Sequence, residues 1–388
     1  MTHRWFLAAL LASAAACTES TTTPTSSPID LTLLDGQHVF RFDTYGDEAF
    51  WTDTLQMHHV VQGVSPKTAL AVGLKVDVAA LPAALVSQLK AGQVNLDTPA
   101  TTVALLKLNA VVGVQATVNA HDSITRFGVT CALCHSTVDN SLAPGIGHRL
   151  DGWPNRDLNP GLILSLSPAL QAPATQAVLT SWGPGKYDAH WNHDNVNGPV
   201  VIPPAYGLAG VNLETYTGEG GIPYWNAYVA VTQMHGHGNF VDPRTGDAVH
   251  YAPDLVTAKL PELQQYELSL TTPPAPADSF DAAAAGRGQA VFFGAGKCST
   301  CHVPPQYTDA GFGLHNPSEV CADSGLAARG TTGKYRTTPL HGLWQHAPFY
   351  HNGSLATLAD VVTHYNTCKA LGLTAGQQAD LVQFLRSL

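Results

Sequence analysis

Three stretches in the first third of the chain carry apolar residues at the spacing of an amphipathic helix. They are residues 65–72, 81–89 and 101–112, where apolar positions recur every three or four residues. Pro82 is compatible with the second stretch because proline is tolerated in a first helical turn. We therefore predict that residues 30–120 are mostly helical.

The same periodicity predicts helices near both ends of the remaining chain. Residues 222–234 carry proline near the start and are followed by two glycines that end the helix. Residues 281–294 are rich in alanine. Residues 374–388 open with Thr374 and Gln377 at capping-box spacing and continue with one apolar stripe. The fold class is therefore predicted to be mainly α.

A segment rich in proline, alanine and serine at residues 269–281 predicts a linker. It divides the chain into an N-terminal domain, residues 30–275, and a C-terminal domain, residues 276–388. In the second domain a helix, a cysteine motif, loops and a closing helix follow one another.

The first 29 residues have the pattern of an export signal and a tether. Residues 1–17 place a basic residue before an apolar run that is too short to cross a bilayer. The alanines before Cys17 are similar to a lipoprotein processing site, so lipidation at Cys17 and plain cleavage with release both remain open. Residues 18–29, rich in Thr, Ser and Pro, predict a flexible tether. We expect the mature protein on the periplasmic side of the cell envelope.

Composition narrows the classes of partner. With 388 residues and 45% hydrophobic content, the chain can bury the cores of more than one domain. Only 12% of the residues are charged and the net charge is -10, which argues against a nucleic-acid partner and allows docking with a basic redox protein.

Two Cys-x-x-Cys-His motifs supply the candidate chemistry. In this pattern two thiols form thioethers with the vinyl groups of a haem, and the adjoining imidazole binds the iron as its proximal ligand. The alternative, a disulfide or a zinc site, would need further paired ligands for zinc, and none stands at such spacing. The motifs are Cys131, Cys134 and His135, and Cys298, Cys301 and His302. They predict two covalently bound haem c groups with His135 and His302 as proximal iron ligands. The fold class is then two c-type cytochrome-like haem domains in tandem, and the first domain, residues 30–275, carries an additional helical region at its N-terminal end.

The other two cysteines of the folded part are Cys321 and Cys368. An even pair in an oxidising compartment favours a disulfide within the C-terminal domain. Two separate buried thiols are the alternative.

Met234 is a candidate distal ligand of the first haem. It shares the small apolar face of the predicted helix 222–234 with Ala227, Ala230 and Val231, so it points inward. A thioether on the iron favours the ferrous state and raises the reduction potential. The alternative is a methionine that only packs in the core.

Two other groups of residues are weaker candidates for a place near a haem. Met57, His58 and His59 can supply a distal ligand, although such residues are more often core or surface. Trp153 and Trp182 pack either on a haem, between the haems, or simply in the core.

A longer motif near the C-terminus carries a family resemblance. It runs from Thr337-Thr338-Pro339-Leu340 through Ala347-Pro348 and His351 to Gly353-Ser354, and continues into a helix from residue 357 to 365. This segment resembles the bacterial di-haem cytochrome c peroxidases, a family that includes the enzyme forming tryptophan tryptophylquinone. The resemblance is close over residues 280–388 and loose over residues 120–245, and it does not cover residues 30–120.

The resemblance implies a distal ligand for the second haem. That ligand stands fourteen positions after the motif's histidine, and counting from His351 leads to Tyr365. The helical pattern independently places Tyr365 on the face of Leu358 and Val362, with His364 turned toward solvent. A phenolate ligand would stabilise ferric iron. The alternative is a core tyrosine hydrogen-bonded elsewhere.

The loose resemblance in the first half implies an internal duplication and a peroxide site. Residues 202–234 look like a diverged copy of residues 338–365. Family peroxidases place a glutamine and, about ten residues later, a carboxylate over the first haem. Gln233 and Asp242 are the nearest match, with Glu219 as a further proton-transfer candidate. Coordination by Met234 would exclude peroxide unless the ligand leaves.

Two functions remain open. The first is a peroxidase-like oxidoreductase in which a small redox protein donates electrons at the His302 haem, and hydrogen peroxide is reduced at the first. The second is a di-haem electron carrier without substrate chemistry. A separate hypothesis is that His190, His193, His235 and His237 bind an additional metal ion.

Overall fold

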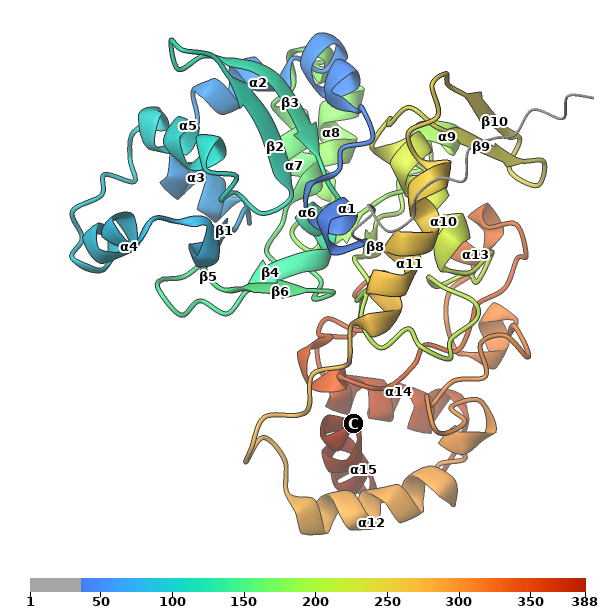
Figure 1. Cartoon of the computed structure of the whole chain (residues 1–388). Helices are drawn as coiled ribbons and strands as arrows, with labels where there is room; N and C mark the ends of the chain where they lie inside the picture. Colours follow the sequence, from blue (N-terminus) through green and yellow to red (C-terminus); the bar gives the residue numbers. More distant parts are fainter. Residues whose placement is uncertain (1–35) are drawn as a thin grey trace, which may run out of the picture.

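The computed structural model describes residues 36–388. The predicted signal peptide, the tether and Cys17 lie outside this range. None of the helices within it is both long enough and apolar enough to cross a membrane. Figure 1 shows a larger N-terminal part above and a smaller C-terminal part below, joined by the loop between α11 and α12.

Helices dominate, as the periodicity predicts. The N-terminal part contains α1 (Gly36–Phe42), α2 (Met57–Gln62), α3 (Pro66–Ala71), α4 (Ala83–Lys90), α5 (Pro99–Lys107), α6 (Ala132–His135), α7 (Pro160–Ser165), α8 (Pro173–Ser181), α9 (Trp191–Asp194), α10 (Ile222–Tyr228) and α11 (Leu260–Ser269). The C-terminal part contains α12 (Ala282–Phe293), α13 (Gly325–Arg329), α14 (Leu358–Cys368) and α15 (Ala375–Ser387).

The strands form five separate pairs. One pair is parallel and four are antiparallel. The parallel pair is β1 (Val76–Asp77) with β5 (Ile146–Gly147), and the antiparallel pairs are β2 (Val114–Val118) with β3 (Ile124–Val129), β4 (Ser136–Val138) with β6 (Arg149–Asp151), β7 (Lys186–Tyr187) with β8 (Val200–Val201), and β9 (Asn239–Asp242) with β10 (Asp247–His250).

The predicted helices of the first third are present, with one correction. Ser65 caps α3 by accepting a hydrogen bond from the Thr68 amide, and Pro82 precedes the first residue of α4. The third predicted helix ends at Lys107 instead of continuing to residue 112. Residues 114–129 form the β2–β3 hairpin, because β-branched residues and a polar turn favour strands there.

The later helices also follow their sequence signals. Residues 222–234 form α10 and continue as a π-helical segment from Val229 to Gln233. Asp281 caps α12, and Thr374 and Gln377 make the predicted capping box of α15. Each cap satisfies backbone amides that a helix start leaves without partners.

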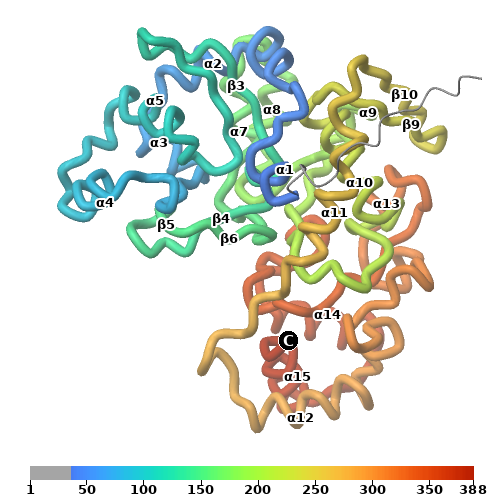
Figure 2. Tube along the Cα trace, in the orientation of Figure 1, coloured from blue at the N-terminus to red at the C-terminus, as the bar shows by residue number. Residues whose placement is uncertain are grey.

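A repeated helix crossing organises both parts (Figures 1 and 2). The sequence Gly-Gln-x-Val-Phe occurs at residues 36–40 in α1 and at residues 288–292 in α12. A Cβ atom on Gly36 would overlap the Glu262 carbonyl of α11, and one on Gly288 would overlap the Asp380 carbonyl of α15. Glycine is therefore required where each pair of helices makes contact.

The helices that contain Gly36 and Gly288 also carry equivalent aromatic contacts. Four residues after each glycine, a fully buried phenylalanine packs against an aromatic ring of the partner helix. The ring pairs are Phe40 with Tyr266, at 5.6 Å, and Phe292 with Phe384, at 5.2 Å. The halves thus share a helix pair, in addition to the copy predicted between residues 202–234 and 338–365.

The crossing changes the interpretation of residues 30–120. Helix α1 belongs to the same packing unit as α11, whereas residues 43–130 separate α1 from the first cysteine motif at Cys131. In the C-terminal part the motif follows α12 almost directly. The extra helices and the β2–β3 hairpin are therefore inserted within the first unit rather than added before it.

We predict that Gly288→Ala destabilises the protein by about 1–3 kcal/mol, because the added methyl group forces α12 away from α15. Gly286 in the same helix has open space around it, so Gly286→Ala is the matched control and should stabilise by about 0.5–1 kcal/mol. Denaturant unfolding followed by circular dichroism measures both. Equal effects of the two substitutions would contradict the close crossing.

Candidate functional site

Two large internal cavities each contain one of the cysteine motifs. The first cavity has a volume of about 520 Å³ and is lined by Cys131, Cys134 and His135. The second has a volume of about 550 Å³ and is lined by Cys298, Cys301 and His302. Both volumes fall in the range of sites that enclose a cofactor.

His135 is held in a fixed orientation at the first cavity. It ends the short helix α6, and its Nδ1 lies 3.1 Å from the Pro203 carbonyl oxygen. Burial lowers the pKa of His135 to about 4, so the ring is neutral at pH 7. A neutral imidazole whose Nδ1–H is bound to a carbonyl offers Nε2 to a metal.

His302 has the same arrangement at the second cavity. Its Nδ1 lies 3.0 Å from the Tyr307 carbonyl oxygen, and burial lowers its pKa. Residues 294–297 separate the motif from the end of α12, the helix that contacts α15 at Gly288. Both histidines therefore present Nε2 in the way that iron ligation requires.

The two cavities share a wall. Five residues line both of them: Pro203, Pro204, Leu208, Tyr216 and Arg336. Arg336 donates to Glu214 at 3.0 Å and to the Leu213 carbonyl at 2.6 Å. Because Pro203 also accepts the bond from His135, the wall connects the first motif to the second cavity.

Arg156 is a partly buried cation beside this wall. It donates to the carbonyl oxygens of Ile202, at 2.6 Å, and His346, at 3.2 Å. No ion pair between residues 36 and 388 includes Arg156, and burial lowers its pKa. Its Nε and that of Arg336 have no hydrogen-bond partner among the described residues.

These observations fit a haem in each cavity. Each cavity provides two thiols, one imidazole and apolar walls. The unpaired Nε atoms of Arg156 and Arg336 suit the carboxylates that a haem carries. A buried N–H without a partner is costly, so an anionic ligand at the wall accounts for both arginines.

The first cavity contains Met234 and Gln233. Met234 is 6% exposed and lines the cavity, as its position on the inner helix face predicts. The Gln233 side chain accepts from the Tyr187 hydroxyl at 2.9 Å and donates to Asn192. Met57 also lines the cavity, whereas His58 and His59 lie in a separate surface pocket.

Asp242 and Glu219 do not line the first cavity, contrary to the expectation that they lie over its haem. Asp242 ends β9, where it accepts from Tyr224 and from Arg244 two residues later. The Arg244 hydrogen bonds lower the pKa of Asp242 to about 2. Glu219 accepts instead from Thr217 at 2.5 Å.

The hypothesis of a four-histidine metal site is wrong for this fold. His235 stacks on Phe50 and His237 stacks on Tyr251, while His193 pairs with Asp247. Among residues 36–388, three ligand atoms come within 4.8 Å of one another only at Cys301, Asp309 and His315. That group includes a cysteine of the second motif.

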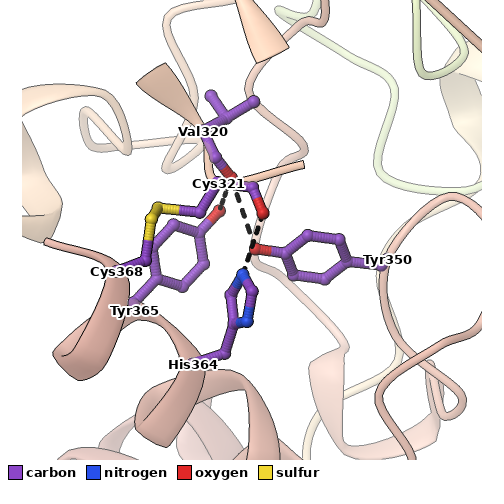
Figure 3. Close-up of a disulfide and its surroundings, with 6 residues drawn as sticks. All are labelled: Val320, Cys321, Tyr350, His364, Tyr365 and Cys368. Carbon is purple, nitrogen blue, oxygen red and sulfur yellow. Dashed lines mark hydrogen bonds between the residues drawn. A yellow bond between two sulfur atoms is a disulfide. The ribbon is translucent and has the colours of Figure 1, made fainter. Parts of the chain in front are cut away.

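Tyr365 lines the second cavity from α14, next to Tyr350 (Figure 3). The hydroxyls of both tyrosines donate to the Val320 carbonyl, at 3.2 Å for Tyr365 and 3.3 Å for Tyr350. Burial raises the pKa of Tyr365. This hydrogen bond corresponds to the alternative predicted for Tyr365, a core tyrosine whose hydroxyl is hydrogen-bonded to a group other than iron.

The predicted disulfide between Cys321 and Cys368 is present. Figure 3 shows that it joins the loop carrying Val320 to the end of α14. His364 does not face solvent as predicted, because it is half-buried and its Nε2 lies 2.8 Å from the Cys321 carbonyl oxygen. The disulfide and this bond hold the loop against Tyr365.

The two tryptophans occupy different places. Trp153 contacts Tyr206 edge to face and also contacts Trp344 of the C-terminal part, at a ring separation of 5.6 Å. Trp182 lines the first cavity and packs against Trp191. Trp153 therefore bridges the two parts, and Trp182 belongs to one of them.

Sequence reasoning missed the carboxylates that do line the first cavity. They are Asp188, Glu214 and Glu267. Glu267 stands seven residues after Leu260 and four after Leu263, on the apolar face of α11, so a carboxylate within an apolar stripe was the available signal. The repeat Gly-Gln-x-Val-Phe was a second signal, since it marks α1 as the counterpart of α12.

Comparisons with known proteins point in the same direction. The family model RoxA-like, cytochrome c-like matches residues 333–369. Cytochrome-c peroxidase IdrP1 of Denitromonas iodatirespirans is 31% identical over 27% of this chain and 40% of that relative. The chain thus spans well under half of the relative it matches. These matches support the resemblance to peroxidase-like di-haem cytochromes and imply haem c as the cofactor.

Two solved structures share weaker similarity. Hydrazine synthase of Kuenenia stuttgartiensis has a TM-score of 0.34 and 17% identity, covering 49% of this chain and 73% of its own. A MauG-like protein associated with microbial copper homeostasis has a TM-score of 0.29 and 20% identity, covering 35% and 54%. TM-scores this low do not establish a shared fold.

We predict that the double variant Cys321→Ala/Cys368→Ala loses about 2–4 kcal/mol of stability, because the crosslink spans 47 positions of chain and restricts the unfolded state. Denaturant unfolding with and without a thiol reductant measures the effect. The reductant should destabilise the wild type and leave the variant unchanged. Equal stability of the wild type and the variant in the absence of reductant would contradict the prediction.

Proposed function

We propose that the protein is an exported di-haem c-type cytochrome that acts as a peroxidase-like oxidoreductase, with two cytochrome c-like units in tandem. The observation that carries this proposal is that each Cys-x-x-Cys-His motif lines its own cofactor-sized cavity with its histidine Nδ1 bound to a carbonyl. The peroxidase relative supports the class of reaction.

The chain's own residues have defined roles in this proposal. The four motif cysteines attach the cofactors, and His135 and His302 each offer Nε2 to an iron. Arg156 and Arg336 bind the haem carboxylates at the shared wall. When bound, haem c supplies an iron that exchanges single electrons and, with one position open, binds peroxide.

Electrons are proposed to enter at the second cavity and pass to the first. Phe293 and Val303, which flank the second motif in sequence, are 45% and 43% exposed. Exposed apolar side chains of this kind suit transient docking of a small redox protein. Trp153 and Trp344 lie in contact between the two parts and supply aromatic groups along the route.

Peroxide reduction is assigned to the first cavity. Gln233 lines it with a side chain already hydrogen-bonded to Tyr187 and Asn192, which orients its amide. Met234 and Met57 both line the same cavity, and a thioether on the iron would favour the alternative function, a di-haem electron carrier. The second cavity instead contains two tyrosines, Tyr350 and Tyr365, whose hydroxyls both donate to the Val320 carbonyl.

Export is proposed from the sequence of the first 29 residues, followed either by lipidation at Cys17 or by plain cleavage and release. The disulfide between Cys321 and Cys368 supports a location outside the reducing cytoplasm. The proposed location is the periplasmic side of the cell envelope.

Covalent attachment gives a direct test. Protein produced in a host that matures c-type cytochromes should exceed the mass of its mature polypeptide by two haems after denaturation. Replacing both cysteines of one motif by alanine, Cys131 with Cys134 or Cys298 with Cys301, should leave one haem. Denatured wild-type protein with the mass of bare polypeptide would overturn the proposal.

Peroxide turnover tests the enzyme against the carrier. We predict that Gln233→Leu lowers kcat/KM for hydrogen peroxide by about 100-fold, because it removes an oriented hydrogen-bonding group from the reaction site. Gln265→Leu is the matched control, since Gln265 is exposed on α11 and should retain wild-type turnover. Wild-type protein that is wholly low-spin in both redox states and turns over no peroxide would leave only the carrier.

A further inference from the structure

Glu267 is a carboxylic acid at a position where the second half of the molecule has leucine. Gly36 contacts Glu262 and Tyr266 of α11, and Gly288 contacts Asp380 and Phe384 of α15. Glu262 is therefore equivalent in position to Asp380, and Tyr266 to Phe384. The residue after each aromatic ring is therefore Glu267 in α11 and Leu385 in α15. Both side chains line their cavities, so the first cavity carries an acid where the second is apolar.

Glu267 is also the carboxylate in the first cavity that has no basic partner. Of the three acids that line the cavity, Asp188 pairs with Arg329 and Glu214 pairs with Arg336. Glu267 is 5% exposed and accepts a single neutral hydrogen bond at 2.7 Å, from Asn226 in α10. A buried carboxylate without a cation is costly to keep charged.

Glu214 increases this cost, because its negative charge repels that of Glu267. Tyr45 and Cys131 also face Glu267, and burial keeps both uncharged at pH 7 by raising their pKa. The nearby cations are engaged elsewhere, Arg41 with Asp151 and Lys259 with Asp43. Burial raises the pKa of Glu267 to about 7, although the Asn226 hydrogen bond acts in the opposite direction.

We propose that Glu267 is the proton-binding group of the first cavity, taking up one proton when the haem bound there gains one electron. This inference rests on the proposed function for the presence of that haem. The electron comes from the small redox protein that serves as donor, and the proton comes from solvent. One negative charge enters the cavity and one carboxylate is neutralised, so the net charge of the buried site does not change.

The sign of the effect follows from the charges. An added electron makes the cavity more negative and raises the proton affinity of Glu267. Reduction is therefore favoured where Glu267 takes up its proton, and the reduction potential falls as pH rises through neutrality. The limit is about 59 mV for each tenfold change in proton concentration, when one proton accompanies one electron.

Redox titration of the purified holoprotein over a pH series tests the proposal. In the wild type, one of the two haem potentials should fall with rising pH. Glu267→Gln should make that potential independent of pH over the same range. Glu267→Leu is a second variant, since leucine is accommodated at the matching position 385. Glu262→Gln is the control, because Glu262 is on the same helix and does not line the cavity.

Infrared difference spectra give an independent readout. Reduction of the wild type should produce a band of a protonated carboxylic acid, which Glu267→Gln lacks and Glu262→Gln retains. The proposal is overturned if both haem potentials are independent of pH in the wild type, or if the dependence persists in both Glu267 variants. A protein that binds no haem fails earlier, at the mass measurement, and contradicts the proposed function instead.

Discussion

Close contact between two helices, made possible by glycine, is the constraint on which each half of this molecule depends. At Gly36 and at Gly288 the backbone of a partner helix occupies the space that any side chain would need. The phenylalanine one turn later then packs on an aromatic ring of the partner, and apolar side chains of that partner complete the core. Glu267 of α11 lines the first cavity, and Phe292 of α12 with Leu385 of α15 lines the second, so the two crossings position cavity-lining side chains in both halves.

Buried ion pairs determine how the halves meet. Arg329 of the C-terminal part pairs with Asp188, which is 1% exposed in its side chain, and Arg336 pairs with Glu214. Removing one member of such a pair leaves a buried charge without a partner, which costs about 3–5 kcal/mol. The pairs therefore restrict the two parts to one relative position, and they place Arg336 where it lines both cavities. The same pairing leaves Glu267 as the acid whose charge is not compensated.

The sequence was most informative where the chemistry is local. Each cysteine motif spans five consecutive residues, and helix periodicity correctly placed Met234 on an inner face and Tyr365 toward the second cavity. It was least informative for the acids. Asp242 matched a spacing, yet Arg244 two residues later holds it outside the cavity. Glu267 belongs to no sequence motif. Its environment depends on a hydrogen bond from Asn226, 41 positions away, and on the packing of α1 against α11.

Sequence alone thus determined the candidate cofactor, the candidate proximal ligands, the main helices and the cysteines available for a disulfide, since each depends on residues close together in the chain or on simple counting. Tertiary structure alone decided which carboxylates face the first cavity, which cations are already paired, and that residues 43–130 are inserted within the first unit. These features depend on contacts between residues far apart in sequence. Burial and charge compensation are properties of such contacts, and no single segment encodes them.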